Sequence, residues 1–308
     1  MEESDCIIHN ITFKCILCSS NRYIIKNNTI RKNKLNIYKI LECVECNHIQ
    51  LYPNIYNTKT YYDNDSQDNE SKLIHNREND EYSEMLNNFH IQRIQILEQN
   101  IKIDNSMKII DIGGGKCEFA KLMSKKCNNI YVLEPGISRI NEIPDENIIK
   151  INKLLDDDFA NENESQFDVV TGFHVLEHVI NPINFLNNCY KLLKPSGLLY
   201  IEVPNQEDTR IELCDYYKNN IWYCQAHISY FTQSTLKYIL HKLSIVNYKF
   251  DTFERYDYEN YLYWINNNKP QPNCTYYKGV CSSKEELDWI NDRNEKSTSD
   301  SLSVIIRK

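Results

Sequence analysis

The sequence predicts an α/β protein with a Rossmann-like, doubly wound and mostly parallel sheet that carries an antiparallel hairpin at its C-terminal edge. Three observations support this fold class. Apolar strand-like segments alternate with helix-like segments from residue 107 onward, an order typical of a parallel sheet with helices on both faces. The first of these strands runs into a glycine-dense turn at 109–115. Two Cys-x-x-Cys pairs mark a small separate module before them.

The chain divides into three parts by composition. Residues 1–55 carry the cysteine pairs, the Asn- and Asp-rich stretch 56–80 is expected to be a linker, and 81–308 carry the alternating pattern. Apolar residues recur among polar ones over 81–100, which predicts an amphipathic helix there. Further strands are expected at 108–112, 130–134, 148–151, 168–173 and 198–203, and further helices at 117–126, 182–193 and 234–243.

The C-terminal part predicts the edge hairpin. Residues 245–250 and 301–306 are both strand-like, and they can pair antiparallel at the edge of the sheet. The stretch between them, 252–299, is rich in tyrosine and tryptophan. We therefore expect it to be an insertion that covers the substrate side of the domain.

The cysteine pairs predict a metal site. Cys15 and Cys18 form one pair, and Cys43 and Cys46 form the other. Each Cys-x-x-Cys turn can place two thiolates on one face of a tetrahedral ion, so the two turns together predict a zinc-ribbon-like Zn²⁺ site. Four protein ligands leave no open position, so the role of this zinc is expected to be structural. Free thiols and disulfides are the alternatives.

The glycine-dense turn and a later acidic residue together predict a site for a nucleotide-like ligand. Glycines let the backbone approach a ligand closely, and the start of the following helix offers free N–H groups. Glu134 closes the next strand, at 130–134. A carboxylate at that position can bind the two hydroxyls of a ribose.

Bulk properties exclude several classes of protein. The formal net charge of −8 argues against a mainly electrostatic grip on nucleic acid. No apolar run is long enough to span a membrane. The acidic start of the chain lacks the basic and apolar regions of a signal peptide. We therefore expect a cytoplasmic protein that does not contact membranes.

Five motifs in a fixed order carry a resemblance to a known family. They are Asp-Ile-Gly-Gly-Gly at 111–115, Glu-Pro-Gly at 134–136, Phe-Asp-Val-Val at 167–170, Val-Leu-Glu-His-Val at 175–179, and the segment 193–205. In this order they resemble class I S-adenosylmethionine-dependent methyltransferases over residues 80–308. With the preceding cysteine pairs, the chain is similar to zinc-binding methyltransferases that act on sugars, including nucleotide-sugar C-methyltransferases.

The resemblance implies the residues that contact S-adenosylmethionine. Asp111, Gly113 and Gly115 are expected at the amino-acid end of the cofactor, and Glu134 at its ribose hydroxyls. The alternative is that the glycines form only a tight turn and that Glu134 is a solvent-exposed loop carboxylate.

Residues after the second, third and fourth strands complete the implied cofactor site. Pro135 is expected near the adenine, and Asn152 is expected to bond the adenine edge. Phe173 and His174 are expected to face the end that carries the methyl group.

Two histidines and, more weakly, two tyrosines are candidates for activating the methyl acceptor. A hydroxyl or carbon acceptor must lose a proton, which calls for a general base such as histidine. His178 and His227 are the histidine candidates, with packing or capping as the alternative role of each. Tyr82 and Tyr230 are weaker candidates, for acid or hydrogen-bond roles.

Residues 174–178 also fit a zinc-peptidase pattern, His-x-x-Glu-His. That pattern belongs inside a helix, where both histidines share one face, whereas here it directly follows a buried strand. We therefore favour the methyltransferase interpretation.

Together these observations predict a methyltransferase acting on a small polar molecule, with a sugar or a nucleotide-linked sugar as the expected acceptor. The first alternative is methylation of RNA or protein, although the acidic charge makes a nucleic-acid partner unlikely. The second is a binding or scaffold protein without turnover. The acceptor atom and the oligomeric state are not specified by the sequence.

Overall fold

The computed structural model describes residues 13–31, 37–54, 80–136, 139, 147–272 and 275–308. Most of the expected linker at 56–80 and the side chain of Tyr82 lie outside the described residues. In the described part of the chain, no helix is long and apolar enough to cross a membrane.

A small antiparallel sheet holds the N-terminal module. Its order is β1-β2-β3-β9, and the fourth strand comes from the second half of the chain. The Leu51 amide also donates to the Ile228 carbonyl oxygen at 2.9 Å, which extends this contact. The strands are β1 (Tyr23–Asn27), β2 (Lys39–Cys43), β3 (Ile49–Tyr52) and β9 (Ser229–Tyr230).

A seven-stranded sheet forms the centre of the molecule, in the order β10-β11-β8-β7-β4-β5-β6. The strands from β8 to β6 are parallel, whereas β11 pairs antiparallel with both β8 and β10. The strands are β4 (Lys108–Ile112), β5 (Asn129–Leu133), β6 (Ile148–Ile151), β7 (Phe167–Phe173), β8 (Leu193–Pro204), β10 (Tyr248–Phe253) and β11 (Ser301–Arg307).

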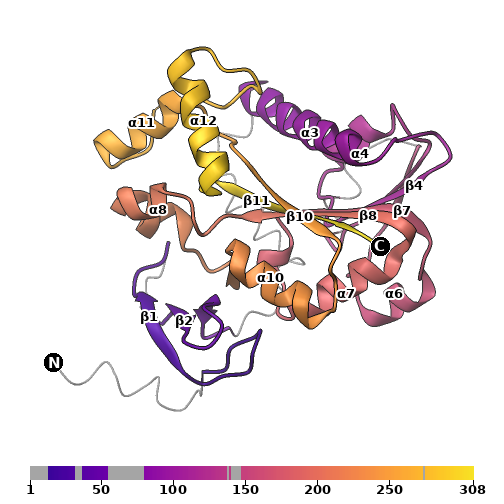
Figure 1. The fold of residues 1–308 in the computed structure, drawn as a ribbon, viewed down its shortest axis with the longest axis horizontal. Helices are drawn as coiled ribbons and strands as arrows, with labels where there is room; N and C mark the ends of the chain where they lie inside the picture. The colour runs from indigo at the N-terminus through magenta and orange to yellow at the C-terminus, as the bar shows by residue number, and fades with distance from the viewer. Residues whose placement is uncertain (1–12, 32–36, 55–79, 137–138, 140–146, 273–274) are drawn as a thin grey trace.

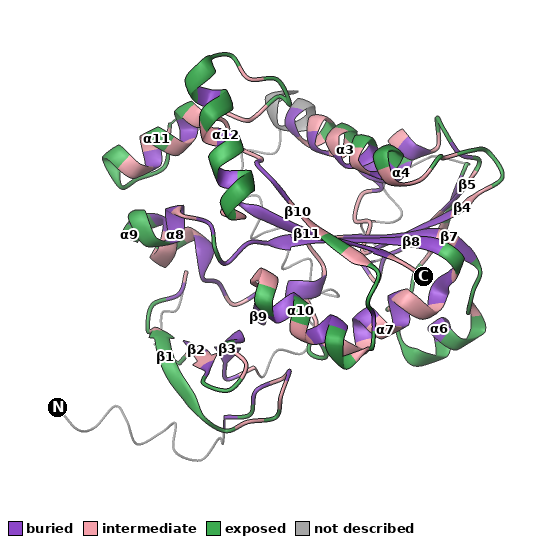
Figure 2. Cartoon of the chain, in the orientation of Figure 1, coloured by how far each residue is buried: buried purple, intermediate pink, exposed green. Residues whose placement is uncertain are grey.

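Helices cover both faces of this sheet because successive strand side chains point to opposite sides. In β4, Ile109 packs in a core with Leu97 and Phe119, while its neighbour Ile110 packs in the core that contains Leu186. Figure 1 shows α3 and α4 over one face and α6, α7 and α10 over the other, and the buried strands lie between them (Figure 2). The helices are α3 (Asp80–Asn100), α4 (Glu118–Met123), α6 (Asp157–Glu162), α7 (Pro182–Leu192) and α10 (Gln233–Lys242).

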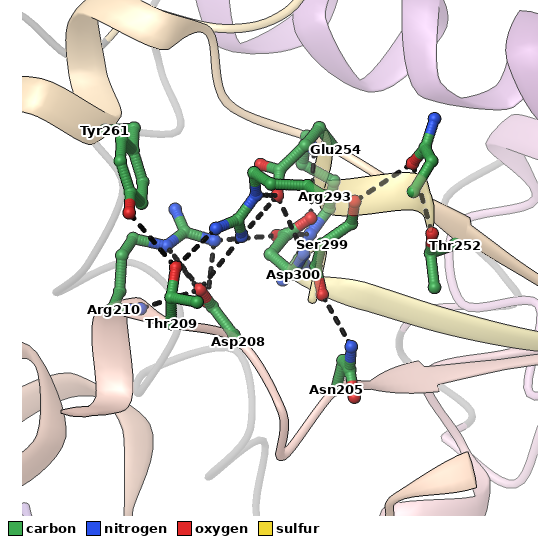
Figure 3. Close-up of polar contacts among 12 residues, drawn as sticks. Asn205, Asp208, Thr209, Arg210, Thr252, Glu254, Tyr261, Arg293, Ser299 and Asp300 are labelled. Carbon is green, nitrogen blue, oxygen red and sulfur yellow. Dashed lines mark hydrogen bonds and ion pairs between the residues drawn. The ribbon is translucent and has the colours of Figure 1, made fainter. Parts of the chain in front are cut away.

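The stretch between β10 and β11 carries α11 (Tyr258–Asn267) and α12 (Lys284–Lys296). A buried charge cluster ties it to the segment after β8 (Figure 3). Arg293 contacts Glu254 at 2.6 Å and Asp208 at 3.1 Å, and Arg210 contacts Asp208 at 2.7 Å. All four side chains are almost completely buried. The segment after β8 includes α8 (Arg210–Leu213), α9 (Asp215–Tyr217) and a π-helical turn, Lys218–Trp222.

The structure confirms the predicted fold class, with local differences. The strand expected at 245–250 begins only at Tyr248, because the Ile245 amide still donates to the Leu240 carbonyl oxygen and closes α10. The helix expected at 117–126 ends at Met123, and hydrogen-bonded turns follow it. The strand expected at 198–203 begins already at Leu193, and residues 194–197 form a bulge within β8, where Ser196 adopts a left-handed φ of 66°.

Candidate active site

The glycine turn lies where β4 ends between β5 and β7. The connection after β4 leads to β5 and the connection after the neighbouring β7 leads to β8, in opposite directions along the sheet, and open α/β sheets bind ligands at such a point. Gly113 and Gly115 have φ of 69° and 54°, a region that L side chains rarely adopt. The Gly113 amide donates to the Leu133 carbonyl oxygen at 2.7 Å and holds the turn against β5.

Glu134 joins the two glycine loops. Its carboxylate accepts a hydrogen bond from the Gly115 amide at 3.0 Å and another from the Gly136 amide at 2.8 Å. The side chain is almost fully buried, so it is not the solvent-exposed carboxylate of the alternative interpretation. The Asn152 side-chain amide donates to the carbonyl oxygens of Glu134 and Pro135, at 3.0 and 2.9 Å, and holds the loop from behind.

Two cavities meet at this edge of the sheet. The first has a volume of about 370 Å³ and is lined by Glu134, Pro135, Leu155 and Asp156, among others. The second has a volume of about 420 Å³, and its wall includes Asp111, Gly115, Phe173 and His227. Three residues line both cavities, namely Gly113, His174 and His178. The two cavities therefore form one crevice that passes over the glycine turn.

Asp111 lies at the base of the second cavity and is 3% exposed. Its carboxylate accepts a hydrogen bond from the Thr171 hydroxyl at 2.7 Å. Burial raises the pKa of Asp111 to about 7, although the Thr171 hydrogen bond acts in the opposite direction. A cation bound beside the Asp111 carboxyl would therefore favour its ionised form.

A buried ion pair orients His174. Arg93 of α3 contacts Glu202 of β8 through two nitrogens, one of them at 2.9 Å, and the His174 Nε2 lies 2.9 Å from the same carboxylate. Burial disfavours the charged form of His174, but the carboxylates of Glu177 and Glu202 outweigh it and raise the His174 pKa. Arg93 of α3 therefore helps to orient His174, which lines both cavities, by way of Glu202.

Glu177, His178 and His227 form a second polar cluster at the wall of the second cavity. Glu177 and His178 lie in a 3₁₀ turn after β7, Leu176–His178, and His227 precedes β9. The His178 Nε2 lies 3.8 Å from the Glu177 carboxylate, and the rings of His178 and His227 have centroids 5.1 Å apart. Burial lowers the pKa of His227 to about 3, with the His178 charge acting in the same direction.

Tyr230 lies behind this cluster. Its hydroxyl donates to the Cys224 carbonyl oxygen and accepts from the Cys224 amide, both at 3.0 Å. Within the described residues, neither Tyr230 nor Asn152 is among those that line the two cavities. Both side chains instead hold loops whose other residues reach the crevice.

Several lining residues were not predicted from the sequence. Arg31 comes from the N-terminal module, Trp222 from the segment after β8, and Arg255 and Tyr256 from the segment after β10, and all four line the second cavity. They are far apart along the chain, so no motif groups them. Glu177 lies within the recognised His-x-x-Glu-His motif, but its burial beside His227 depends on the tertiary fold.

The four cysteines of the N-terminal module converge. The Cys15 and Cys46 sulfurs are 3.5 Å apart and those of Cys18 and Cys43 are 3.4 Å apart, and all four lie within 4.8 Å of one another. A tetrahedral zinc with Zn–S bonds of about 2.3 Å requires sulfurs about 3.8 Å apart. A hydrogen bond from Cys46 lowers the pKa of Cys15 to about 5, so a thiolate is already favoured there. This cluster fits a zinc ion.

Comparison with known proteins assigns the fold to a family. A family model described as a methyltransferase domain matches residues 86–244. The chain belongs to this methyltransferase family. The family implies S-adenosylmethionine as the cofactor for the crevice.

Curated relatives are distant and match in part. Ubiquinone biosynthesis O-methyltransferases of Pseudomonas aeruginosa (strain UCBPP-PA14) and Colwellia psychrerythraea (strain 34H) are 27% identical over 104 residues and 29% identical over 129 residues. These matches cover 32% and 37% of this chain, and 45% and 52% of the relatives. The chain spans about half the length of the curated relatives it matches.

Solved structures agree on the fold alone. A chain of the complex between the Haloferax volcanii Trm112 methyltransferase activator and the putative methyltransferase has a TM-score of 0.50 and is 11% identical. The match covers 81% of this chain and 96% of that one. An Archaeoglobus fulgidus SAM-dependent methyltransferase is 20% identical with a TM-score of 0.49, over 71% of this chain and 94% of that one.

Proposed function

We propose that the crevice binds S-adenosylmethionine across both cavities and that the second cavity also holds a small polar methyl acceptor. The observation that carries this proposal is the sharing of Gly113, His174 and His178 by the two cavities. One extended ligand can then place its adenosine beside Glu134 and its methyl end beside His174. When bound, S-adenosylmethionine supplies a methyl group that its sulfonium already activates.

The cofactor contacts follow from the two loops. Glu134 is proposed to accept hydrogen bonds from the ribose hydroxyls, with Pro135 against the adenine. Asn152, which is not among the described lining residues of either cavity, is proposed to act by fixing the backbone of both residues.

The glycine turn and the residues above it are proposed to hold the amino-acid end. Gly113 and Gly115 let the backbone approach the ligand, and the Asp111 carboxylate faces its cationic groups. Phe173 and His174 are proposed to flank the methyl group, which must be aligned with the acceptor for transfer.

The second cavity favours a sugar, or a sugar linked to a nucleotide, as the acceptor. Arg31 and Arg255 carry guanidinium groups that suit a phosphate, although that of Arg255 is also paired with Asp300. Trp222 and Tyr256 are aromatic rings that suit the apolar face of a sugar. His178 and His227 are proposed to activate the acceptor hydroxyl or carbon. Tyr230 is proposed to position His227 by holding the Cys224 backbone.

The N-terminal module is proposed to bind a structural Zn²⁺ through Cys15, Cys18, Cys43 and Cys46. Because β3 of this module pairs with β9, the metal would also stabilise the segment that begins beside His227. Four thiolates leave no open position on the ion, so the zinc takes no part in methyl transfer.

A screen with a labelled methyl donor tests the proposed function. Nucleotide sugars, simple phenols suggested by the curated relatives, RNA and protein extracts serve as separate acceptor classes. Transfer to a nucleotide sugar at the highest kcat/KM is expected. Calorimetry should show S-adenosylmethionine binding, and an absence of binding by the folded protein would refute the proposal. Binding with no transfer to any class would favour the non-catalytic alternative, and transfer to RNA or protein would contradict the sugar assignment.

A further inference from the structure

Three potential metal ligands from two distant segments converge at the wall of the second cavity. A carboxylate oxygen of Glu177 and a ring nitrogen from each of His178 and His227 lie within 4.8 Å of one another. One carboxylate and two imidazoles form a donor set that zinc and its neighbours in the first transition row bind well. The set differs from the four sulfurs of the N-terminal module, which lie in a separate cluster.

His178 is oriented as a metal-binding histidine is. Its Nδ1 lies 2.7 Å from the Ala226 carbonyl oxygen, and a carbonyl oxygen can only accept a hydrogen bond. Nδ1 therefore carries the proton, and Nε2 presents a lone pair toward Glu177, 3.8 Å away. Metal-ligating histidines almost always donate their second nitrogen in this way, often to a backbone carbonyl.

The cluster also contains two buried polar atoms that find no hydrogen-bond partner among the residues that the structure describes. They are Oε2 of Glu177 and Nδ1 of His227. Glu177 is 1% exposed, and an unsatisfied buried polar group destabilises the fold, a charged one most of all. Both atoms belong to residues of the same cluster at the cavity wall.

We propose that Glu177, His178 and His227 bind one divalent transition-metal cation in the acceptor cavity. Metal–nitrogen bonds of about 2.1 Å in a tetrahedral site place ligand atoms about 3.4 Å apart. The 3.8 Å between His178 Nε2 and the Glu177 carboxylate thus needs only a small contraction. Three protein ligands leave at least one coordination position open toward the cavity, as in catalytic metal sites.

The open coordination position would let the cation activate the methyl acceptor, and this role rests on the proposed function. An acceptor hydroxyl bound there would be acidified by the cation. As the new carbon–oxygen bond forms, the carbon–sulfur bond of the donor breaks and leaves a neutral thioether. The hydroxyl proton leaves to water through the second cavity. In this arrangement His178 and His227 act by holding the cation and not by taking the proton.

Cobalt titration tests the site without depending on activity. Protein whose cysteine cluster is already filled with zinc is titrated with Co²⁺ and followed by visible absorption and calorimetry. One further equivalent should bind and give d–d bands without the strong near-ultraviolet bands of thiolate ligation. His227→Ala and Glu177→Gln should each weaken Co²⁺ binding at least tenfold. His241→Ala, on the exposed end of α10, is the matched control and should leave it unchanged.

The outcomes separate this inference from the proposed function. Circular dichroism and S-adenosylmethionine affinity establish that each variant is folded. Equal Co²⁺ uptake by His227→Ala and the unaltered protein, or no uptake beyond the cysteine cluster, would overturn the site. Full methyl transfer by protein that retains only the cysteine-bound zinc would overturn its catalytic role while leaving the proposed function intact. Co²⁺ binding with no methyl transfer to any acceptor would support the site and count against the proposed function.

Discussion

Replacing Gly113 by alanine tests how tightly the β4 turn is packed. A Cβ at this position would lie 2.5 Å from Cγ2 and 3.3 Å from Cγ1 of Val175, and a β-branched side chain has few rotamers in which to move away. The backbone φ of 69° adds strain of about 1–2 kcal/mol for an L residue. Overpacking adds about 1–3 kcal/mol. We therefore expect Gly113→Ala to destabilise the protein by about 2–5 kcal/mol.

Gly115→Ala is the matched control for this substitution. Its φ of 54° is also left-handed, but a Cβ there would meet nothing within 4 Å. Only backbone strain of about 1–2 kcal/mol is therefore expected. Urea unfolding without ligand measures both variants. The same measurement in a Val175→Ala background should reduce the cost of Gly113→Ala to that of Gly115→Ala. Equal costs for the two glycines in the original background would refute the steric reasoning.

Three further predictions concern charge and metal binding. The pKa of Asp111 near 7 means that its carboxylate is mostly neutral at about pH 6, so S-adenosylmethionine affinity measured by calorimetry should rise about eightfold by about pH 7.5. In Asp111→Asn this rise should disappear. Arg93→Met removes the guanidinium partner of the buried Glu202 but leaves its contact with His174, and it should cost about 3–5 kcal/mol in urea unfolding. Cys46→Ser should reduce the metal content measured by mass spectrometry to less than one zinc per chain and lower the thermal midpoint.

Each of these predictions has a contradicting result. If Asp111→Asn keeps the same pH dependence of S-adenosylmethionine affinity, a group other than Asp111 is responsible for it. Arg93→Met combined with Glu202→Met should be more stable than Arg93→Met alone, and a less stable double variant would show that the ion pair does not act as a unit. A full zinc equivalent in Cys46→Ser would contradict the four-cysteine site.

The elements of the fold were predictable because each depends on local patterns. Short stretches of consecutive residues predict the alternation of strands and helices and the turn at Gly113. The structure confirms the resulting fold class. Strand limits were less accurate: the apolar pair at 245–246 suggested a strand, but a backbone hydrogen bond from Ile245 ties this segment to α10. Local pattern alone does not show which partner such a segment will find.

The candidate site was less predictable because tertiary contacts decide the environment of each side chain. The position of Glu134 after β5 could be read from the sequence, whereas its two backbone hydrogen bonds could not. Asn152 was expected to contact adenine, yet its amide nitrogen is engaged by the backbone. Arg31 and Arg255 reach the same cavity from opposite ends of the chain, and only the fold brings them together.

The pairing of β3 with β9 means that the N-terminal module is not an independent appendage. Gln50 and Ile49 pair with Ser229 and Tyr230, so a chain cut between the module and the remainder would expose an unsatisfied strand edge on each fragment. Exchange of this module between related proteins should therefore succeed only when the receiving β9 segment is exchanged with it. For the same reason, we expect substitutions in β3 to be accompanied by substitutions in β9 among related proteins.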